Sequence, residues 1–185
     1  CSTVVMAAML RWFEAWKMPV LTAPFVFTAL CFLLACARFG RLHSTHVLPT
    51  AGLPSLEVAV EGVVTTTTVV EGLFNGVAQV FFQGSVLTGV LFVLGLLVSS
   101  RRAFIMALLG SLTGLLVAWG MGAAEPAIRS GAFGFNCVLT AIALGSMFYA
   151  LDKASAAYTL LATIATAVVF AAVSEALERL GMPAL

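Results

Sequence analysis

Long apolar runs, separated by short polar stretches, dominate the chain. Five windows contain no Asp, Glu, Lys, Arg or His: residues 18–37, 72–100, 103–124, 130–151 and 154–174. A helix needs about 20 mostly apolar residues to cross a bilayer. Four of the windows therefore predict one spanning helix each. Alternation over about ten residues, typical of membrane β-strands, is absent. We expect an all-α integral membrane protein.

The window 72–100 is too long for one span and is interrupted at Gly84-Ser85. We interpret residues 72–83 as a half-length helix that ends within the membrane, followed by a short span. Such an end exposes backbone polar groups, which is tolerated only where they line a cavity. Residues 57–71 hold three Glu and a run of four Thr, and they suit an interface or an extramembrane loop.

The polar segments suggest how the chain is divided. Residues 1–16 are typical of the end of a helix, which Pro19 breaks. Residues 38–56 predict a linker between two halves. His43 and His46 lie in this linker at i and i+3, but two ligands do not make a zinc site. We therefore expect no metal and no other cofactor.

Composition supports the membrane assignment. The chain is 62% hydrophobic and 9% charged, whereas soluble domains carry about 25% charged residues. The net charge of +1 implies no nucleic-acid partner. We expect a multi-pass protein of the cell membrane, with Arg101-Arg102 as the best candidate for a cytoplasmic loop.

A short pattern occurs near both ends of the chain. Residues 14–21, EAWKMPVL, align with residues 178–185, ERLGMPAL, and the Glu, Met, Pro and final Leu coincide. We expect a part of a longer protein with an internal repeat, which in membrane proteins usually means two halves enclosing a transport path. The G-x-x-x-G pairs at residues 72–76 and 110–114 predict close helix packing.

Uncharged polar and aromatic residues are the remaining candidates for chemistry. Asn75, Gln79 and Phe82 share one face of the expected half-helix. Gln79 offers an acceptor oxygen and two N–H donors, which suits a small neutral hydrogen-bonding solute. The alternative is an interhelical hydrogen bond that serves packing only.

A second candidate lies at residues 131–136, GAFGFN, which predict a bend that opens a helix. Phe135 and Leu139 then share a face, either lining a narrow slot or packing in the ordinary way. The expected membrane windows hold no paired carboxylates, no Ser/His/Asp set and no phosphate loop, so we do not expect an enzyme.

Four motifs together resemble the urea transporters: LTAPF at residues 21–25, GVAQVFF at 76–82, LTG at 87–89 and FGFN at 133–136. The resemblance covers most of the chain except residues 42–70. It implies that residues 1–41 end a first repeat, that 42–70 form a linker or interface segment, and that 71–185 belong to a second repeat.

The resemblance also implies an architecture and an activity. The family has two inverted-topology halves with a pore between them, and it assembles in the lipid bilayer as homotrimers in which each protomer has its own pore. Transport of urea is passive and channel-like. The other readings are a channel for another small neutral solute, such as a short amide, ammonia or water, and a structural membrane subunit without a pore.

Six pore-lining positions follow from the resemblance. Gln79 matches a Gln or Glu near one end of the selectivity filter, and Val80 and Phe82 follow it on the pore helix, where carbonyls form an oxygen ladder. Phe135 and Leu139 match residues that narrow the slot. Thr22 matches the pore threonine of the first half.

Overall fold

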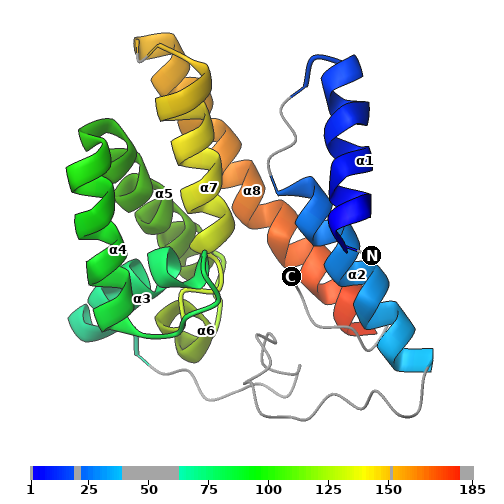
Figure 1. Cartoon of the computed structure of the whole chain (residues 1–185). Helices are drawn as coiled ribbons and strands as arrows, with labels where there is room; N and C mark the ends of the chain where they lie inside the picture. Colours follow the sequence, from blue (N-terminus) through cyan, green and yellow to red (C-terminus); the bar gives the residue numbers. More distant parts are fainter. Residues whose placement is uncertain (1, 19–21, 39–62, 151, 180–185) are drawn as a thin grey trace. The chain divides into compact units, whose positions relative to one another are not determined.

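The computed structural model describes residues 2–18, 22–38, 63–150 and 152–179, and all regular structure within these ranges is helical (Figure 1). The helices fall into two compact units that are described separately. α1 and α2 pack together in the first. The second holds α3 to α8. In chain order the elements are α1 (Ser2–Ala15), α2 (Ala23–Arg38), α3 (Thr66–Gln79), α4 (Val86–Ser99), α5 (Arg101–Gly120), α6 (Glu125–Arg129), α7 (Phe135–Ile142), the π-helix η1 (Ala143–Phe148) and α8 (Lys153–Arg179).

Two described helices are long and apolar enough to cross a membrane: Arg101–Gly120 in α5 and Lys153–Leu177 in α8. The helices Val86–Ser99 and Phe135–Phe148 are apolar but shorter. The predicted interruption of the window 72–100 is confirmed, because α3 ends at Gln79 and α4 begins at Val86.

The bounds predicted for the half-helix, residues 72–83, are wrong. α3 begins earlier because Thr65 and Thr68 form a capping box in which each side chain binds the other residue's backbone N–H at 3.3 Å. Residues 66–71 are therefore helical and do not form a loop. α3 also includes Glu71, so it extends beyond the uncharged window.

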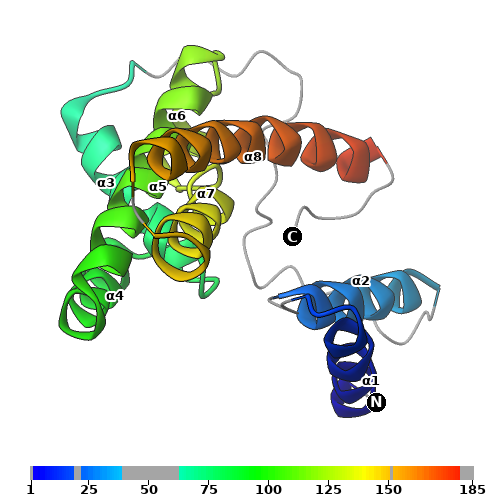
Figure 2. The ribbon, with the colours of Figure 1, turned by 90° about the horizontal axis from the view of Figure 1, so that it is seen from above.

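α5 is the central helix of the second unit and contacts α3, α4, α7 and α8 (Figure 2). Its close approach to α7 depends on two glycines. A Cβ built at Gly110 would lie 2.5 Å from the Cys137 carbonyl oxygen, and a Cβ at Gly114 would lie 3.0 Å from Cys137 Sγ. The prediction that this G-x-x-x-G pair serves packing is confirmed.

The first glycine pair seats α3 in the same way. A Cβ at Gly72 would lie 2.5 Å from the Ile128 carbonyl oxygen, and one at Gly76 would meet Ser111 of α5 and Gly134. Ser111, which is fully buried, donates to the Leu73 carbonyl at 2.7 Å. α3 therefore lies directly against α5 and the segment that leads into α7.

Two apolar clusters form the core of this unit. The first joins α3, α4, α5 and α7 through Val77, Val93, Ala107 and Val138. The second joins α5, α6 and α8 and consists of Leu115, Ala118, Ala127, Ile128, Phe133 and Phe170. Both lie against α5, which explains why that helix is buried on several sides.

The amino end of α8 is capped by polar side chains. Asp152 Oδ1 accepts from the Ser155 backbone N–H at 2.7 Å, and Ser155 Oγ accepts from the Asp152 N–H at 3.0 Å. The hydrogen bond from the Ser155 backbone lowers the pKa of Asp152. The cap therefore begins α8 sharply, just outside its apolar stretch.

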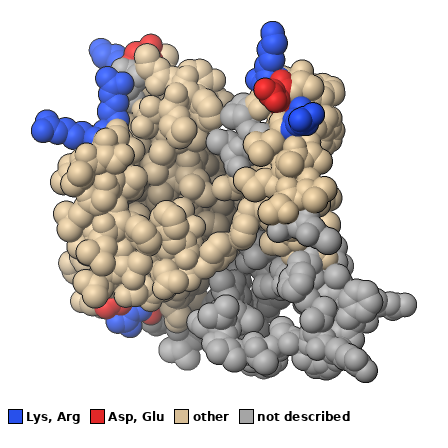
Figure 3. All heavy atoms as spheres, viewed as in Figure 1, with Lys and Arg blue, Asp and Glu red and all other residues tan. Residues whose placement is uncertain are grey.

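Charged side chains of the second unit gather at its upper and lower edges, with uncharged surface between them (Figure 3). Arg101, Arg102 and Lys153 begin α5 and α8, while Glu125 and Arg129 bound α6. The middle of the unit exposes large apolar side chains, including Leu91 and Leu94 of α4 and Leu161 of α8. This distribution matches a protein surface that faces hydrocarbon between two polar boundaries.

Candidate functional site

The carboxyl end of α3 is closed by a turn that contains a strained residue. Phe82 has φ 57°, in the left-handed region. Its N–H donates to the Gln79 carbonyl at 2.9 Å, and the Gln83 N–H donates to the Ala78 carbonyl at 3.2 Å. This is the Schellman pattern, in which glycine is usual because a side chain there costs about 1–2 kcal/mol. Phe82 nevertheless carries a phenyl ring, and the residue is 61% exposed.

Val80 and Phe82 were expected on the pore helix, and this detail is wrong. Val80 is the C-cap of α3, and Phe82 lies in the turn beyond it. Phe82 therefore does not share a helix face with Asn75 and Gln79. It remains next to Gln79 because its backbone N–H binds the Gln79 carbonyl.

Two amide side chains of α3 bind the last residue of α6 and the residue that follows it. Asn75 Nδ2 donates to the Arg129 carbonyl at 2.9 Å, and Gln79 Nε2 donates to the Ser130 carbonyl at 3.3 Å. The packing hydrogen bond that the sequence left open for Gln79 is thus present. Because an N–H must face the carbonyl, Gln79 Oε1 is the amide atom directed away from Ser130. Half-buried Gln79 therefore keeps an acceptor oxygen beyond its packing role.

The predicted bend before α7 is confirmed, since residues 130–134 form turns and Phe135 is the first residue of the helix. Phe135 and Leu139 stand one turn apart and are both half-buried. The Phe135 ring packs edge to face on Phe170, with centroids 5.2 Å apart. Part of the Phe135 side chain is therefore buried against Phe170, and another part remains exposed.

The predicted residues fall into three places. Gln79, Val80 and Phe82 lie together at the end of α3. Phe135 and Leu139 follow Gly134, whose Cα would lie 3.2 Å from a Cβ built at Gly76 of α3. Thr22 is exposed, precedes α2 and belongs to the other unit.

Other contacts of α3 have no clear signal in the sequence. Thr68 Oγ1 donates to Glu125 Oε1 at 2.7 Å, and Glu71 forms an ion pair with Arg129 Nε. The opposite charges of Glu71 and Arg129, in a chain with few charged residues, are the one sequence feature that suggests this pair. Pairing them requires the knowledge that α6 folds back onto α3.

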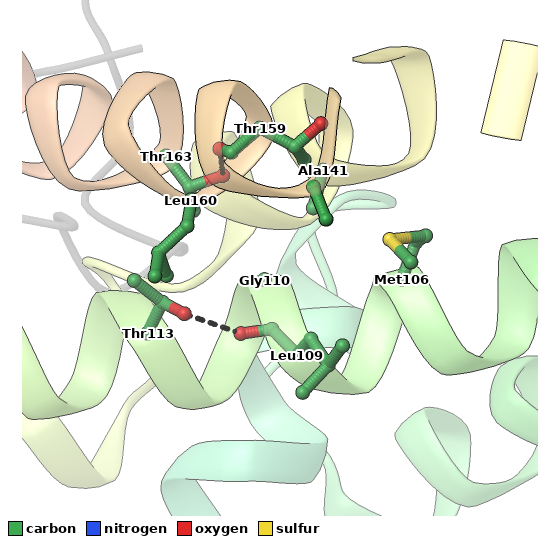
Figure 4. A pocket seen from close by; sticks show the side chains of 9 residues that line it. Met106, Leu109, Gly110, Thr113, Ala141, Thr159, Leu160 and Thr163 are labelled. Carbon is green, nitrogen blue, oxygen red and sulfur yellow. Dashed lines mark hydrogen bonds between the residues drawn. The ribbon is translucent and has the colours of Figure 1, made fainter. Parts of the chain in front are cut away.

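A separate cavity of about 80 Å³ lies between α5, α7 and α8 (Figure 4). Its hydroxyl donors are used within their own helices, since Thr113 binds the Leu109 carbonyl and Thr163 binds the Thr159 carbonyl, both at 2.7 Å. None of the predicted pore residues lines it. Its walls are formed by Met106, Leu109, Gly110, Thr113, Ala141, Ala156, Thr159, Leu160 and Thr163.

Metal ligands do not cluster in the part of the chain that the structure describes. No three His, Cys, Asp or Glu side chains there could hold a metal ion. His43 and His46, considered above for metal binding, lie outside the described residues.

The sequence model of the family described as "Urea transporter" matches residues 1–185. The chain belongs to the urea transporter family. It is similar to Urea transporter 1 of Rattus norvegicus, with 27% identity over 182 residues, which cover 98% of this chain and 47% of the relative. The Ovis aries protein of the same name is 29% identical over 169 residues, which cover 91% of this chain and 43% of the relative.

This urea transporter family chain spans about half the length of the curated relatives it matches. Membership identifies it as part of a membrane protein, in agreement with the two helices long and apolar enough to cross a bilayer. The resemblance stated from the four motifs is confirmed.

Proposed function

We propose that the protein containing this chain carries urea passively across the cell membrane through a narrow uncharged pore. Family membership and the name of the relatives, Urea transporter 1, support this function. The protein is a transporter and not an enzyme. Its pore lies between two inverted repeats, with α1 and α2 at the end of the first and α3 to α8 in the second, and it assembles as a homotrimer.

The observation that carries this proposal is the end of α3. An exposed phenyl ring occupies a strained backbone position directly beside a glutamine with an available acceptor oxygen. Strain of this kind persists where the surrounding structure imposes it, and it concentrates at functional sites. Gln79 and Phe82 thus combine a polar contact and a flat apolar surface.

The chemistry of urea fits such a pair. Urea is neutral, planar and rich in N–H donors, so Gln79 Oε1 can replace a hydrogen bond to water, each unreplaced bond costing about 1–3 kcal/mol. Phe82 and Phe135 form the flat walls of the slot, and Leu139 narrows it. Thr22 contributes from the first repeat. The Ala78 and Gln79 carbonyls accept N–H groups of the turn, so the carbonyl ladder begins at Val80.

Helix length supports a half-spanning role for α3. Its 14 residues extend about 21 Å at the usual rise, less than the roughly 30 Å of hydrocarbon. The repeat also has structural support. Lys17, at the end of α1, has φ 52°, and the residue aligned with it in the second copy is Gly181, the residue type usual at such a position.

Stopped-flow light scattering on proteoliposomes that contain the full-length protein tests the proposal. Urea efflux should exceed that of empty liposomes, saturate, and be indifferent to a protonophore or to membrane potential. Equal acceleration of acetamide, ammonia or water would favour the broader neutral-solute channel. Flux no faster than in empty liposomes would leave the structural subunit as the better description.

A further inference from the structure

An asparagine side chain is energetically unfavourable at position 75. The residue is 8% exposed, and its Oδ1 is buried without a hydrogen-bond partner among the described residues. A buried acceptor without a partner destabilises a fold, so native proteins hold few of them. The Asn75 amide satisfies only its donor side, through the bond from Nδ2 to the Arg129 carbonyl at 2.9 Å. Packing alone would be served better by an apolar side chain.

The hydrogen bond from Asn75 helps to fix the position of residues 129–130 along α3. Arg129 and Ser130 offer consecutive carbonyls, and Asn75 and Gln79, one helical turn apart, each bind one of them. The loop after α6 lies directly on the α3 backbone, because Gly131 has φ 76° and a Cβ built there would lie 2.6 Å from the Asn75 carbonyl carbon. A shift of the loop along α3 would therefore move the Ser130 carbonyl away from Gln79.

We propose that Asn75 is a positioning residue that sets the orientation of the Gln79 amide. By fixing the Arg129 carbonyl, Asn75 holds the Ser130 carbonyl at Gln79 Nε2, which leaves Oε1 as the atom presented to a solute. This inference rests on the proposed function. It adds a determinant of specificity that does not itself touch the solute.

The physical consequence concerns which solutes are recognised. A terminal amide has a broad, nearly two-fold rotamer preference, so an unconstrained Gln79 would present N–H₂ about as readily as oxygen. An amide locked with its oxygen outward favours solutes with many N–H donors. Urea and acetamide have nearly the same shape, but acetamide has a methyl group in place of one N–H₂. Their flux ratio therefore reports the orientation of the amide.

The decisive experiment is a double-mutant cycle in reconstituted full-length protein. Asn75→Ala and Gln79→Leu should each lower the urea-to-acetamide ratio by about three- to tenfold, the size of one net hydrogen bond. The double variant should show no further fall, because Asn75 acts through Gln79. A ratio that falls by the product of the two single effects overturns the proposal, as does an unchanged ratio in Asn75→Ala.

Thr68→Val is the control from the same helix, since it removes the buried Thr68 hydroxyl and its hydrogen bonds to Glu125 and Thr65 without touching Arg129 or Ser130. Its ratio should equal that of wild type. Hydrogen exchange gives a readout independent of transport. Amides of residues 129–134 should exchange faster in Asn75→Ala than in Thr68→Val, and equal exchange overturns the positioning role of Asn75. Asn75→Leu, which has a similar size and no hydrogen-bonding group, serves if Asn75→Ala does not fold. A wild-type protein without urea flux overturns the proposed function, while the exchange result still tests whether Asn75 positions residues 129–130.

Discussion

Phe82 combines a strained backbone with an exposed ring, and the two can be separated by mutation. Phe82→Gly and Phe82→Ala both remove the ring, but glycine alone adopts φ 57° without a steric cost. Phe82→Gly should therefore be more stable than Phe82→Ala by about 1 kcal/mol. Both variants should lose selectivity for urea. Thermal unfolding in detergent and solute flux in liposomes measure the two effects.

Gly122 provides the control for this comparison. It closes α5 with the same hydrogen-bond pattern and φ 80°, and a Cβ there would meet nothing within 4 Å. Gly122→Ala should destabilise the protein by about 1 kcal/mol through backbone strain alone. Equal stability of the two Phe82 variants would contradict the left-handed turn. Wild-type selectivity in both would show that the ring has no role in transport.

Phe133 and Phe135 allow slot lining to be distinguished from packing. Both rings pack edge to face on Phe170, at 5.7 and 5.2 Å, but Phe133 is 6% exposed and Phe135 is half-buried. Phe133→Ala should cost about 3–5 kcal/mol of stability and leave selectivity unchanged in the protein that folds. Phe135→Ala should cost less and admit bulkier amides. Flux of a substituted urea series would measure this, and identical selectivity in both variants would assign Phe135 to packing.

At the scale of elements, apolar periodicity locates helices better than it locates their ends. The break between α3 and α4 follows from the length of the apolar window and from Gly84-Ser85. The ends of α3 depend on two local arrangements, the Thr65–Thr68 capping box and the left-handed Phe82. Neither has a simple sequence signature, because a Thr run is common in loops and a Phe is rare where glycine normally ends a helix.

Two helical glycines, one packed between α5 and α7 and one on an open part of α4, should respond in opposite ways to substitution by alanine. Gly114→Ala should destabilise the protein by about 1–3 kcal/mol, because its Cβ would press on Phe133 and Cys137. Gly95→Ala in α4 should stabilise it by up to about 1 kcal/mol, since nothing in the described part of the chain lies within 4 Å. Thermal unfolding compares the pair. Destabilisation by Gly95→Ala would instead reveal a close neighbour of α4 in the complete protein.

At the scale of the whole molecule, the sequence could nominate candidate pore residues but could not predict the contacts that hold them. Gln79, Phe82 and Phe135 could be selected because amides and aromatics stand out in an uncharged chain. Their supports could not, since the Ser130 carbonyl and the Glu71–Arg129 pair become neighbours only when α6 folds back on α3. Every residue has a backbone carbonyl, so the sequence does not reveal which carbonyl will accept a side-chain hydrogen bond.

The charges at the two ends of the second unit predict its orientation in the membrane. Arg101 and Arg102 begin α5, and Lys153 begins α8 at the same end, since Met106 of α5 and Ala156 of α8 line the same cavity. The opposite end carries Glu125 and other residues of α6. Positive residues favour the cytoplasmic side. We therefore expect the end with Arg101 and Lys153 to face the cytoplasm.

Cysteine labelling of intact cells tests this orientation in a background without native cysteines. Lys153→Cys should react with an impermeant maleimide only after permeabilisation. Met121→Cys, which follows α5 and replaces a residue 65% exposed, should react from outside. The reverse pattern would mean that neighbouring segments outweigh the Arg101–Lys153 cluster in setting orientation. Labelling of both sites from one side would contradict α5 as a membrane-spanning helix, since its 20 residues match a hydrocarbon layer of about 30 Å.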